Sequence, residues 1–362
     1  MNVFILAESL RTCDAVGNSA LQECFALTVQ GHQVKLYASN FDDYFEPFLI
    51  DRNALLKSIK MRESLILYHH SIFWEEGGFI LDEAKCKILL RYHNITPDHF
   101  FDNYSNYFSN LSKKGRQQTR TIIKSGKINQ YLSDSNYNAA ELIESGAPQN
   151  AVSVVAPFHQ INDFDKTRLN LDLLETMLDG KINVLSVGRI VPNKGFHHAI
   201  EVIDRYMSYY GDTIRFYIVG GTDPHFQGYV DELMNGLSNL RLDNNVTFTG
   251  KVSFEDLHTY YVASHTFLLM SEHEGFCLPI LESQYHKLPI VALDRCAVKD
   301  TLGDEQLSIK DLDYNAFASA IHTVVTDNNV RNYLAENGCR NYRKYQSEVL
   351  NEQLSRIINA QA

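Results

Sequence analysis

Short apolar runs alternate along the chain with longer segments in which apolar and polar positions mix. Apolar runs of about four to eight residues between turn residues are typical of buried strands. The first half contains such runs at 2–7, 31–38, 64–70, 87–93, 128–133 and 151–157. Because helical segments such as 19–30 separate these runs, crossover connections must join the strands, which favours a parallel sheet.

The same alternation restarts near residue 182. The expected strands of the second half are 182–188, 214–221, 246–250, 265–270 and 288–294. Helices are expected over about 194–209 and 227–241, and a polar stretch of mixed charge, 158–172, joins the two halves.

We therefore expect an α/β protein with two doubly wound, Rossmann-like domains. The N-terminal domain would span 1–165 and the C-terminal domain 166–344, and a helix over about 345–362 would pack back on the first domain. Ligands of such sheets bind at the carboxyl ends of the strands. We therefore expect a central cleft that the two domains face.

Composition narrows the class of protein. The 362 residues carry a net charge of -11, which argues against general nucleic-acid binding. The apolar start is expected to be a buried strand and not a signal peptide, and no apolar run is long enough to span a membrane. The six cysteines lack metal-finger spacing and the histidines lack an HExxH pair, so we expect reduced thiols in a cytosolic protein and no metal site.

Two cations flank the turn after the expected strand 182–188. Arg189 follows this strand, and Lys194 directly precedes Gly195, where the next helix begins. Backbone N–H groups at a helix start, together with two cations, suit a phosphate or a diphosphate. Two solvated basic residues beside a turn are the alternative interpretation.

A second group of polar residues follows the expected strand 265–270. Glu274 is expected in a loop, and Glu282 about one turn into the helix that Pro279 begins. This placement favours two separate ligand contacts over an acid–base pair that acts on one atom. One exposed Glu and one Glu that interacts with the helix dipole are the alternative. Glu272 is interpreted as an exposed loop residue.

Two residues of the first half lie where strands are expected to end. Gly17 belongs to the expected loop 14–20, which lacks the GxGxxG fingerprint of dinucleotide binding. His93 is the last residue of the expected strand 87–93 and precedes a helix that begins at Pro97. A lone histidine is more often structural than functional, so the sequence leaves both interpretations of His93 open.

Four motifs together resemble the retaining GT-B glycosyltransferases of family 4. They are "VGRIVPNKG", "FYIVGG", "VTFTGKVSFEDLHTYYVAS" and "EGFCLPILE", in that order. The resemblance is strong over about 182–303 and loose over the rest of the chain. It implies the GT-B fold and a nucleotide-sugar donor.

The resemblance also implies roles for single residues of the second half. Arg189 and Lys194 would neutralise the donor diphosphate. Glu274 would contact the sugar hydroxyls, and Glu282 the ribose hydroxyls. Val252 would contact the base through its backbone.

Further roles follow from the same resemblance. Backbone N–H groups would bind the sugar and the phosphates at Gly275, Phe276, Cys277 and Leu278. Gly17 would lie near the phosphates, and His93 near the donor sugar and the reacting carbon. Two cations and a helix start can replace a metal, so we expect metal-independent chemistry without a cofactor.

The implied activity is transfer of a hexose in bacterial surface-polysaccharide synthesis, from GDP-mannose or, as the alternative, a UDP-hexose. A GT-B sugar-nucleotide epimerase and a non-catalytic nucleotide-sugar-binding subunit are the other candidates. The acceptor would be a glycan or a polyprenyl-diphosphate-linked sugar.

A basic, aromatic stretch is a candidate for contact with the acceptor or a membrane. No acidic residue lies between Asn103 and Ser133 in a chain with 44 acidic residues. The candidate contact residues are Lys113, Lys114, Arg116, Arg120 and Lys124. Basic and aromatic side chains together suit an anionic membrane surface or a lipid diphosphate, and a solvated helix face is the alternative. The expected location is the cytoplasm, at the inner face of the plasma membrane if this contact forms.

Overall fold

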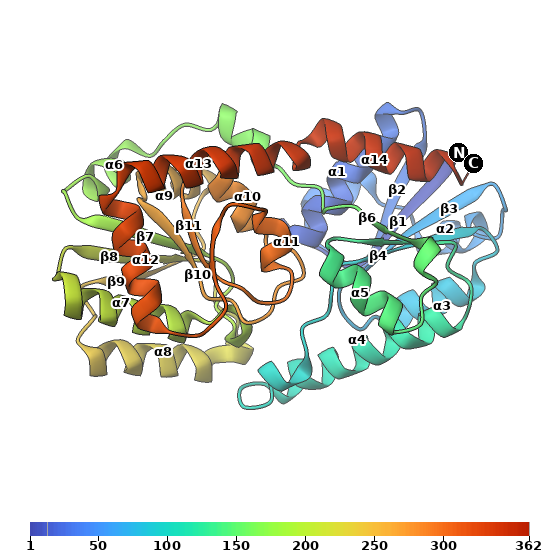
Figure 1. Ribbon diagram of the computed structural model, residues 1–362. Coiled ribbons are helices and arrows are strands. Elements are labelled where there is room, and N and C mark those ends of the chain that lie inside the picture. Colours follow the sequence, from blue (N-terminus) through green and yellow to red (C-terminus); the bar gives the residue numbers. More distant parts are fainter. Residues whose placement is uncertain (13, 362) are drawn as a thin grey trace. The chain divides into compact units, whose positions relative to one another are not determined.

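The computed structural model describes residues 1–12 and 14–361 as two compact units. Unit 1 comprises the described residues of Met1–Asp98, Phe108–Gln160 and Tyr345–Ala362, and unit 2 comprises His99–Tyr107 and Ile161–Lys344. Each unit holds one parallel six-stranded sheet with helices on both of its faces (Figure 1). The predicted α/β class with two doubly wound sheets is confirmed.

The sheet of unit 1 has the strand order β2-β1-β3-β4-β5-β6. Its strands are β1 (Asn2–Leu10), β2 (Gln33–Phe41), β3 (Ser64–His70), β4 (Lys87–Tyr92), β5 (Gln130–Ser133) and β6 (Val152–Val154). Its helices are α1 (Ala15–Val29), α2 (Arg52–Ser58), α3 (Glu75–Glu83), α4 (Asn106–Lys124), α5 (Asn136–Glu144) and α14 (Ser347–Asn359). Every residue of β3 is buried, because this strand has a partner on each side and helices cover both faces.

Figure 1 shows α4 and α5 on one side of the first sheet and α1 and α14 on the other. Helix α14, although last in the chain, packs against α1.

The sheet of unit 2 has the order β12-β11-β10-β7-β8-β9. Its strands are β7 (Ile182–Val187), β8 (Ile214–Val219), β9 (Val246–Gly250), β10 (Thr266–Leu269), β11 (Ile290–Leu293) and β12 (Leu307–Ile309). Its helices are α6 (Leu171–Met177), α7 (Phe196–Tyr210), α8 (Gln227–Leu240), α9 (Phe254–Ala263), α10 (Leu278–Tyr285), α11 (Val298–Leu302), α12 (Tyr314–Thr326) and α13 (Asn328–Tyr342). Figure 1 shows α7 and α8 on one side of this sheet, and α9 and α10 on the other.

The strand order of unit 2 reverses between β7 and β10. The chain proceeds from β7 to β8 and β9 on one side, and from β10 to β11 and β12 on the other. The loops that leave β7 and β10 therefore diverge at the carboxyl ends of two neighbouring strands. A topological switch point of this kind is where doubly wound sheets bind ligands.

The prediction of a loop over 14–20 is wrong, because most of this segment is helical. Strand β1 continues to Leu10 and helix α1 begins at Ala15, so Gly17 lies in the first helical turn and not in a loop. The side chain of Asp14 caps this helix by accepting from the N–H groups of Val16 and Gly17, at 3.0 and 3.2 Å. A Cβ at position 17 would lie 2.5 Å from the carbonyl oxygen of Arg11, so the glycine lets the helix approach the preceding backbone.

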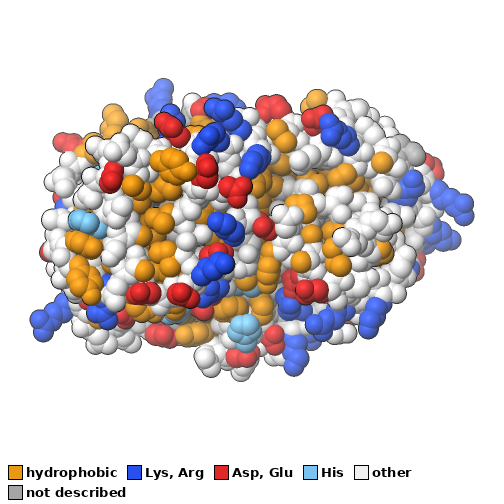
Figure 2. Space-filling view, viewed as in Figure 1, with side chains coloured by type: hydrophobic (Ala, Val, Ile, Leu, Met, Phe, Trp, Pro, Cys, Tyr) orange, Lys and Arg blue, Asp and Glu red, His pale blue; other side chains and the backbone are white. Residues whose placement is uncertain are grey.

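The surface in Figure 2 shows Lys and Arg side chains interspersed with Asp and Glu side chains over most of the drawn face. Within residues 1–12 and 14–361, no helix combines the length and the apolar character that crossing a membrane requires.

Candidate donor site at the carboxyl ends of β7 and β10

The turn after β7 lies against the end of β10 because of one glycine. Gly195 has a φ of 64°, in the left-handed region, and directly precedes α7. A Cβ on Gly195 would lie 2.0 Å from the carbonyl oxygen of Met270. No other residue type could take this conformation at so short a distance without displacing the backbone. The glycine therefore brings the start of α7 close to the loop that follows β10.

This arrangement joins the two motifs that the sequence analysis treated separately. The Nζ atom of Lys194 lies 2.7 Å from Oε1 of Glu274, with the two side chains 19% and 7% exposed. Burial alone would lower the pKa of Lys194, but the carboxylate of Glu274 outweighs that effect and the pKa is raised. Lys194 therefore carries its positive charge in a largely water-excluded position.

Asn193 is a residue that the sequence analysis missed. Its carbonyl oxygen accepts from the N–H of Glu272 at 2.9 Å, and its Nδ2 donates to the carbonyl oxygen of His273 at 3.1 Å. The side chain is buried, so these bonds fix the loop after β10 to the turn after β7. In the sequence Asn193 directly precedes Lys194, and nothing there distinguishes it from a turn residue.

The backbone at the start of α10 is constrained. Cys277 is the N-cap residue and adopts a left-handed conformation with a φ of 79°, which is uncommon for a residue other than glycine. Burial and the nearby carboxylate of Glu274 raise the pKa of the Cys277 thiol well above its usual range. The thiol is therefore neutral at neutral pH. At the start of α10, Pro279 has no N–H and the N–H of Ile280 donates to the carbonyl oxygen of Cys277 at 3.1 Å. The N–H of Leu278 and the positive end of the helix dipole are therefore the groups that would suit an anion here.

Glu282 lies within α10, as predicted, and has a partner that the sequence did not indicate. The hydroxyl of Tyr261 donates to Oε2 of Glu282 at 2.5 Å. Burial raises the pKa of Glu282, and the Tyr261 hydrogen bond opposes that effect. Tyr261 is buried in α9, so its hydroxyl holds one carboxylate oxygen of Glu282 in place.

The other predicted donor residues of unit 2 also follow strand ends. Arg189 is exposed and comes two residues after the last residue of β7. Val252 is partly buried in the loop between β9 and α9, and Phe276 is buried in the loop before α10. Gly275 adjoins Glu274 in the same loop. Glu272, interpreted from the sequence as an exposed loop residue, is partly buried and faces His197 and His198.

His93 belongs to unit 1, where it is part of a buried polar network. Its Nδ1 lies 2.7 Å from Oδ2 of Asp134, and its Nε2 lies 2.9 Å from Nδ1 of His69. His69 in turn places Nε2 3.0 Å from Oε2 of Glu23, and Arg91 places Nε 2.9 Å from Oε1 of the same carboxylate. Both ring nitrogens of His93 therefore have partners within unit 1.

Burial shifts the pKa values of two groups in this network. It would raise the pKa of Glu23, but Arg91 and His69 hold it at about 2, so Glu23 is ionised at neutral pH. Burial also lowers the pKa of His69 below its ordinary value, although the carboxylate of Glu23 opposes that effect.

The predicted acceptor residues lie on α4 and differ in their partners. Arg116 pairs with Glu141 and donates from Nη1 to the carbonyl oxygen of Ile95 at 2.8 Å, so it has a structural role within unit 1. The Nζ of Lys114 lies 5.6 Å from the centre of the Phe73 ring. The exposed basic residues of α4 are Lys113, Lys114, Arg120 and Lys124.

Part of the chain is similar in sequence to known glycosyltransferases. Residues 176–340 match the family model described as "Glycosyl transferases group 1". The lipopolysaccharide core biosynthesis glycosyltransferase LpsE of Rhizobium meliloti is 30% identical over 169 residues, which span 46% of this chain and 45% of LpsE. The O-antigen chain mannosyltransferase RfbU of Salmonella typhimurium is 28% identical over 141 residues, which span 39% of this chain and 37% of RfbU. The matches thus span less than half the length of these two relatives.

The similarity of the fold extends further than the similarity of the sequence. The crystal structure of Anabaena Alr3699/HepE in complex with UDP and glucose matches with a TM-score of 0.79 at 16% identity, over 99% of this chain and 100% of that chain. Residues 176–340 therefore carry the pattern of the glycosyl transferases group 1 family, in a chain that has the GT-B fold.

Proposed function

We propose that the chain transfers a hexose from a nucleotide-sugar donor to a glycan or lipid-linked acceptor in bacterial surface-polysaccharide synthesis. The observation that carries this proposal is the contact between Lys194 and Glu274 at the carboxyl ends of β7 and β10. It offers a cation for a diphosphate and a carboxylate for sugar hydroxyls at one position. The match of residues 176–340 to the glycosyl transferases group 1 family supports the same activity.

In the proposed reaction, cleavage of the bond between the sugar and the diphosphate builds negative charge on the leaving phosphate. Lys194, Arg189 and the N–H of Leu278 at the start of α10 would stabilise this charge. Fixed cations and N–H dipoles do this without a divalent ion at the diphosphate, so the proposed chemistry is metal-independent. Retention of the anomeric configuration belongs to the same proposal, with the leaving phosphate accepting the proton of the acceptor hydroxyl.

Glu274 would contact the sugar hydroxyls and Glu282 the ribose hydroxyls. The hydroxyl of Tyr261 supports the second assignment, because it fixes the Glu282 carboxylate at one oxygen only. The backbone of Val252 would contact the base. From unit 1, Gly17 would lie near the phosphates and His93 near the reacting carbon. Because both ring nitrogens of His93 have partners, its contact with the sugar would use the main chain or follow a side-chain rearrangement.

We propose GDP-mannose as the donor, with a UDP-hexose as the alternative. Two relatives are O-antigen chain mannosyltransferases, RfbU and mannosyltransferase B of Escherichia coli, which supports mannose. The similar HepE structure contains UDP and glucose, which supports the alternative.

We further propose that the exposed basic face of α4 contacts an anionic membrane or a polyprenyl-diphosphate-linked acceptor. Lys113, Arg120 and Lys124 are seven and eleven positions apart along the helix, so they lie on one side of it. On this proposal, the protein would act in the cytoplasm at the inner face of the plasma membrane.

Donor binding tests the proposal directly. The melting temperature of the chain would be measured with GDP, UDP, ADP and dTDP sugars, since a ligand that binds the folded state raises apparent stability by about 2.7 kcal/mol at 100 times its Kd. We expect GDP-mannose to give the largest shift. Lys194→Met should abolish it, and Lys310→Met, at an exposed lysine beyond β12, should not. If none of the sugar nucleotides shifts the melting temperature, the proposal is wrong.

Product analysis separates transfer from the other candidates. A transferase releases some free sugar from its donor by hydrolysis, whereas a non-catalytic subunit binds the donor and leaves it intact. An epimerase would return a different sugar nucleotide without any acceptor. We expect slow release of free hexose and nucleoside diphosphate, and faster release when a lipid-linked acceptor is added.

A further inference from the structure

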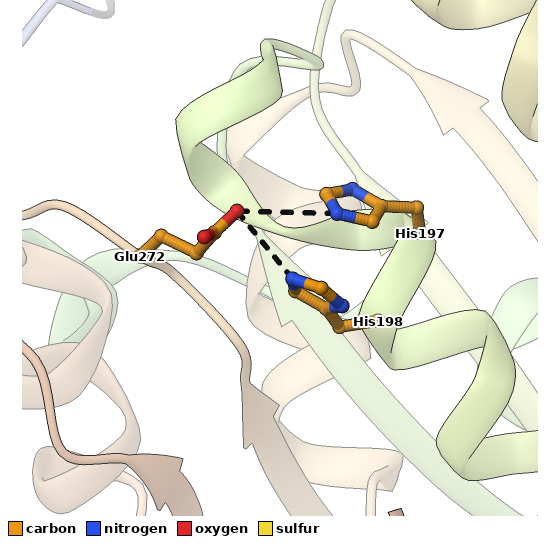
Figure 3. Close-up of side chains that lie close together, drawn as sticks. All are labelled: His197, His198 and Glu272. Atoms are coloured by element: carbon orange, nitrogen blue, oxygen red, sulfur yellow. Dashed lines mark ion pairs between the residues drawn. The ribbon is translucent and has the colours of Figure 1, made fainter. Parts of the chain in front are cut away.

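Three side chains next to the candidate donor site converge on one point. Within residues 1–12 and 14–361, these side chains are His197, His198 and Glu272. Each offers one atom that could bind a metal ion, and the three atoms lie within 4.8 Å of one another. Figure 3 shows the two imidazole rings at the start of α7 facing one oxygen of Glu272, which lies in the loop after β10. All three residues belong to unit 2.

Glu272 makes one long contact to each imidazole, and the shorter one, to His198, lowers the pKa of Glu272. The Nε2 atoms of His197 and His198 lie 3.9 and 3.4 Å from Oε1 of Glu272. An N–H···O hydrogen bond spans about 2.7–3.2 Å. Ligand atoms about 2.0–2.1 Å from a tetrahedral zinc ion lie about 3.3 Å from one another. The three ligand atoms lie within 4.8 Å of one another, so small movements of the side chains would bring them to the spacing of a metal site.

The rings are held in the orientation that such a site needs. Nδ1 of His197 lies 3.0 Å from the hydroxyl of Tyr229, and Nδ1 of His198 lies 2.9 Å from the hydroxyl of Tyr314. Tyr229 is fully buried, which fixes its hydroxyl in position. Metal-binding histidines characteristically use their second ring nitrogen in this way, because the hydrogen bond sets both ring orientation and tautomer. The two Nε2 atoms are thereby turned towards Glu272.

We propose that His197, His198 and Glu272 form a binding site for one divalent transition-metal ion, with Zn²⁺ as the preferred ion. Two imidazoles and a carboxylate suit zinc and its neighbours in the first transition row, whereas Mg²⁺ and Ca²⁺ prefer oxygen ligands. Three protein ligands leave a fourth tetrahedral position for water. No metal site was expected from the sequence because the histidines lack HExxH spacing, whereas this site joins adjacent histidines to a glutamate 74 positions later.

The ion would join two segments that carry the candidate donor residues. The histidines lie in the first turn of α7, three and four positions after Lys194, and Glu272 lies two positions before Glu274. A bound ion would restrain the loop after β10 relative to α7, in addition to the bonds that Asn193 makes. The ion would thus be structural and separate from the groups that bind the diphosphate. The inference holds whichever donor the protein uses.

Direct metal binding tests the site. Untagged protein would be stripped with a chelator and titrated calorimetrically with Zn²⁺, and separately with Co²⁺, whose visible absorption reports coordination by protein ligands. We expect one equivalent of Zn²⁺ to bind. His198→Ala and Glu272→Gln should each weaken binding at least tenfold. Tyr314→Phe, which removes only the hydroxyl next to His198, should weaken it about 10–100-fold.

His225→Ala is the matched control. His225 is another histidine of unit 2 that pairs with a carboxylate, placing Nδ1 2.8 Å from Oδ1 of Asp223, but it is outside the three-residue cluster. This variant should bind Zn²⁺ as the unmodified chain does. Circular dichroism of each metal-free variant distinguishes lost ligation from lost folding, and Glu272→Gln keeps the size of the side chain. Absence of stoichiometric binding in the unmodified chain, or equal binding by folded Glu272→Gln, would overturn the proposal.

Discussion

Lys194 and Glu274 form an ion pair with Nζ and Oε1 2.7 Å apart, although they are 80 residues apart in the sequence. They meet because β7 and β10 are neighbours in the sheet and Gly195 lets the two following loops approach. Each side chain thus neutralises the other in a position that is largely protected from water. A ligand that bears both phosphate and sugar hydroxyls would replace this single contact with two.

This pairing predicts that removing both partners costs less than the sum of removing each one alone. Lys194→Met leaves the buried carboxylate of Glu274 without its cation, and we expect it to lower the free energy of unfolding by about 1–3 kcal/mol. Glu274→Gln should have a similar effect. The double variant should lose less than the sum of the two, with a coupling energy of about 0.5–3 kcal/mol. Urea unfolding of the four proteins measures the coupling, and strictly additive losses would contradict the assignment.

Gly195 should tolerate no side chain. Gly195→Ala combines a left-handed backbone with a Cβ 2.0 Å from the Met270 carbonyl oxygen, so we expect a loss of at least about 2 kcal/mol and weaker donor binding. Gly236→Ala is the matched control. Gly236 lies inside α8 with no atom within 4 Å of an added Cβ, and alanine should stabilise that helix by about 0.5–1 kcal/mol. Thermal unfolding of the two variants should therefore shift in opposite directions.

The strands could be predicted from the sequence because their signal is local. The expected strands 64–70 and 246–250 have the bounds of β3 and β9, where apolar runs are sharply bounded. The short strand β12 was missed, because Leu307–Ile309 is a three-residue run of partly buried positions without a strong apolar pattern. Gly17 was assigned to a loop because Gly and Asn favour turns, but the Asp14 cap starts the helix before them.

The candidate site was predictable where residues follow strand ends, and not where residues meet across the fold. The sequence suggested Lys194, Glu274 and Glu282 one at a time. It could not indicate that Asn193 holds the loop after β10 or that Tyr261 holds Glu282, because those contacts join distant segments.

Acid should destabilise the protein through His70. Burial lowers the pKa of His70 from an ordinary value of 6.5 to about 4, so the unfolded chain binds a proton that the folded chain rejects. The stabilisation is fully present above pH 6.5 and is lost as the pH falls towards 4, by about 3 kcal/mol in total. The urea midpoint of unfolding, measured at intervals from pH 6.5 to about 4, should fall less steeply with falling pH for His70→Gln than for the unmodified chain. An equally steep fall would assign the pH dependence to other groups.

Vesicle binding should depend on one face of α4. Changing Lys113, Arg120 and Lys124 to glutamate should remove roughly 1 kcal/mol or more per residue of attraction to an anionic surface, which weakens binding at least about 100-fold. Added salt should weaken binding by the unmodified chain in the same direction. The control reverses three other exposed lysines of unit 1, namely Lys35, Lys57 and Lys85. Binding is measured by sedimentation with anionic vesicles. If the unmodified chain, the α4 variant and the control variant bind equally, α4 is a solvated helix face and not a membrane contact.

The two carboxylates of the candidate site should differ in their kinetic effects. Glu274 adjoins the phosphate-binding cation and would contact the sugar, where charge changes during the reaction, so Glu274→Ala should mainly lower kcat. Glu282 would contact the ribose, which does not react, so Glu282→Ala should mainly weaken nucleotide binding and raise KM. Tyr261→Phe removes the hydroxyl that orients Glu282, so it should raise KM as Glu282→Ala does, but by a smaller factor. Steady-state kinetics together with calorimetric titration of the nucleoside diphosphate distinguish a loss of turnover from a loss of nucleotide binding. If Glu274→Ala raised KM alone while Glu282→Ala lowered kcat alone, the sugar and the ribose would have to exchange places in the site.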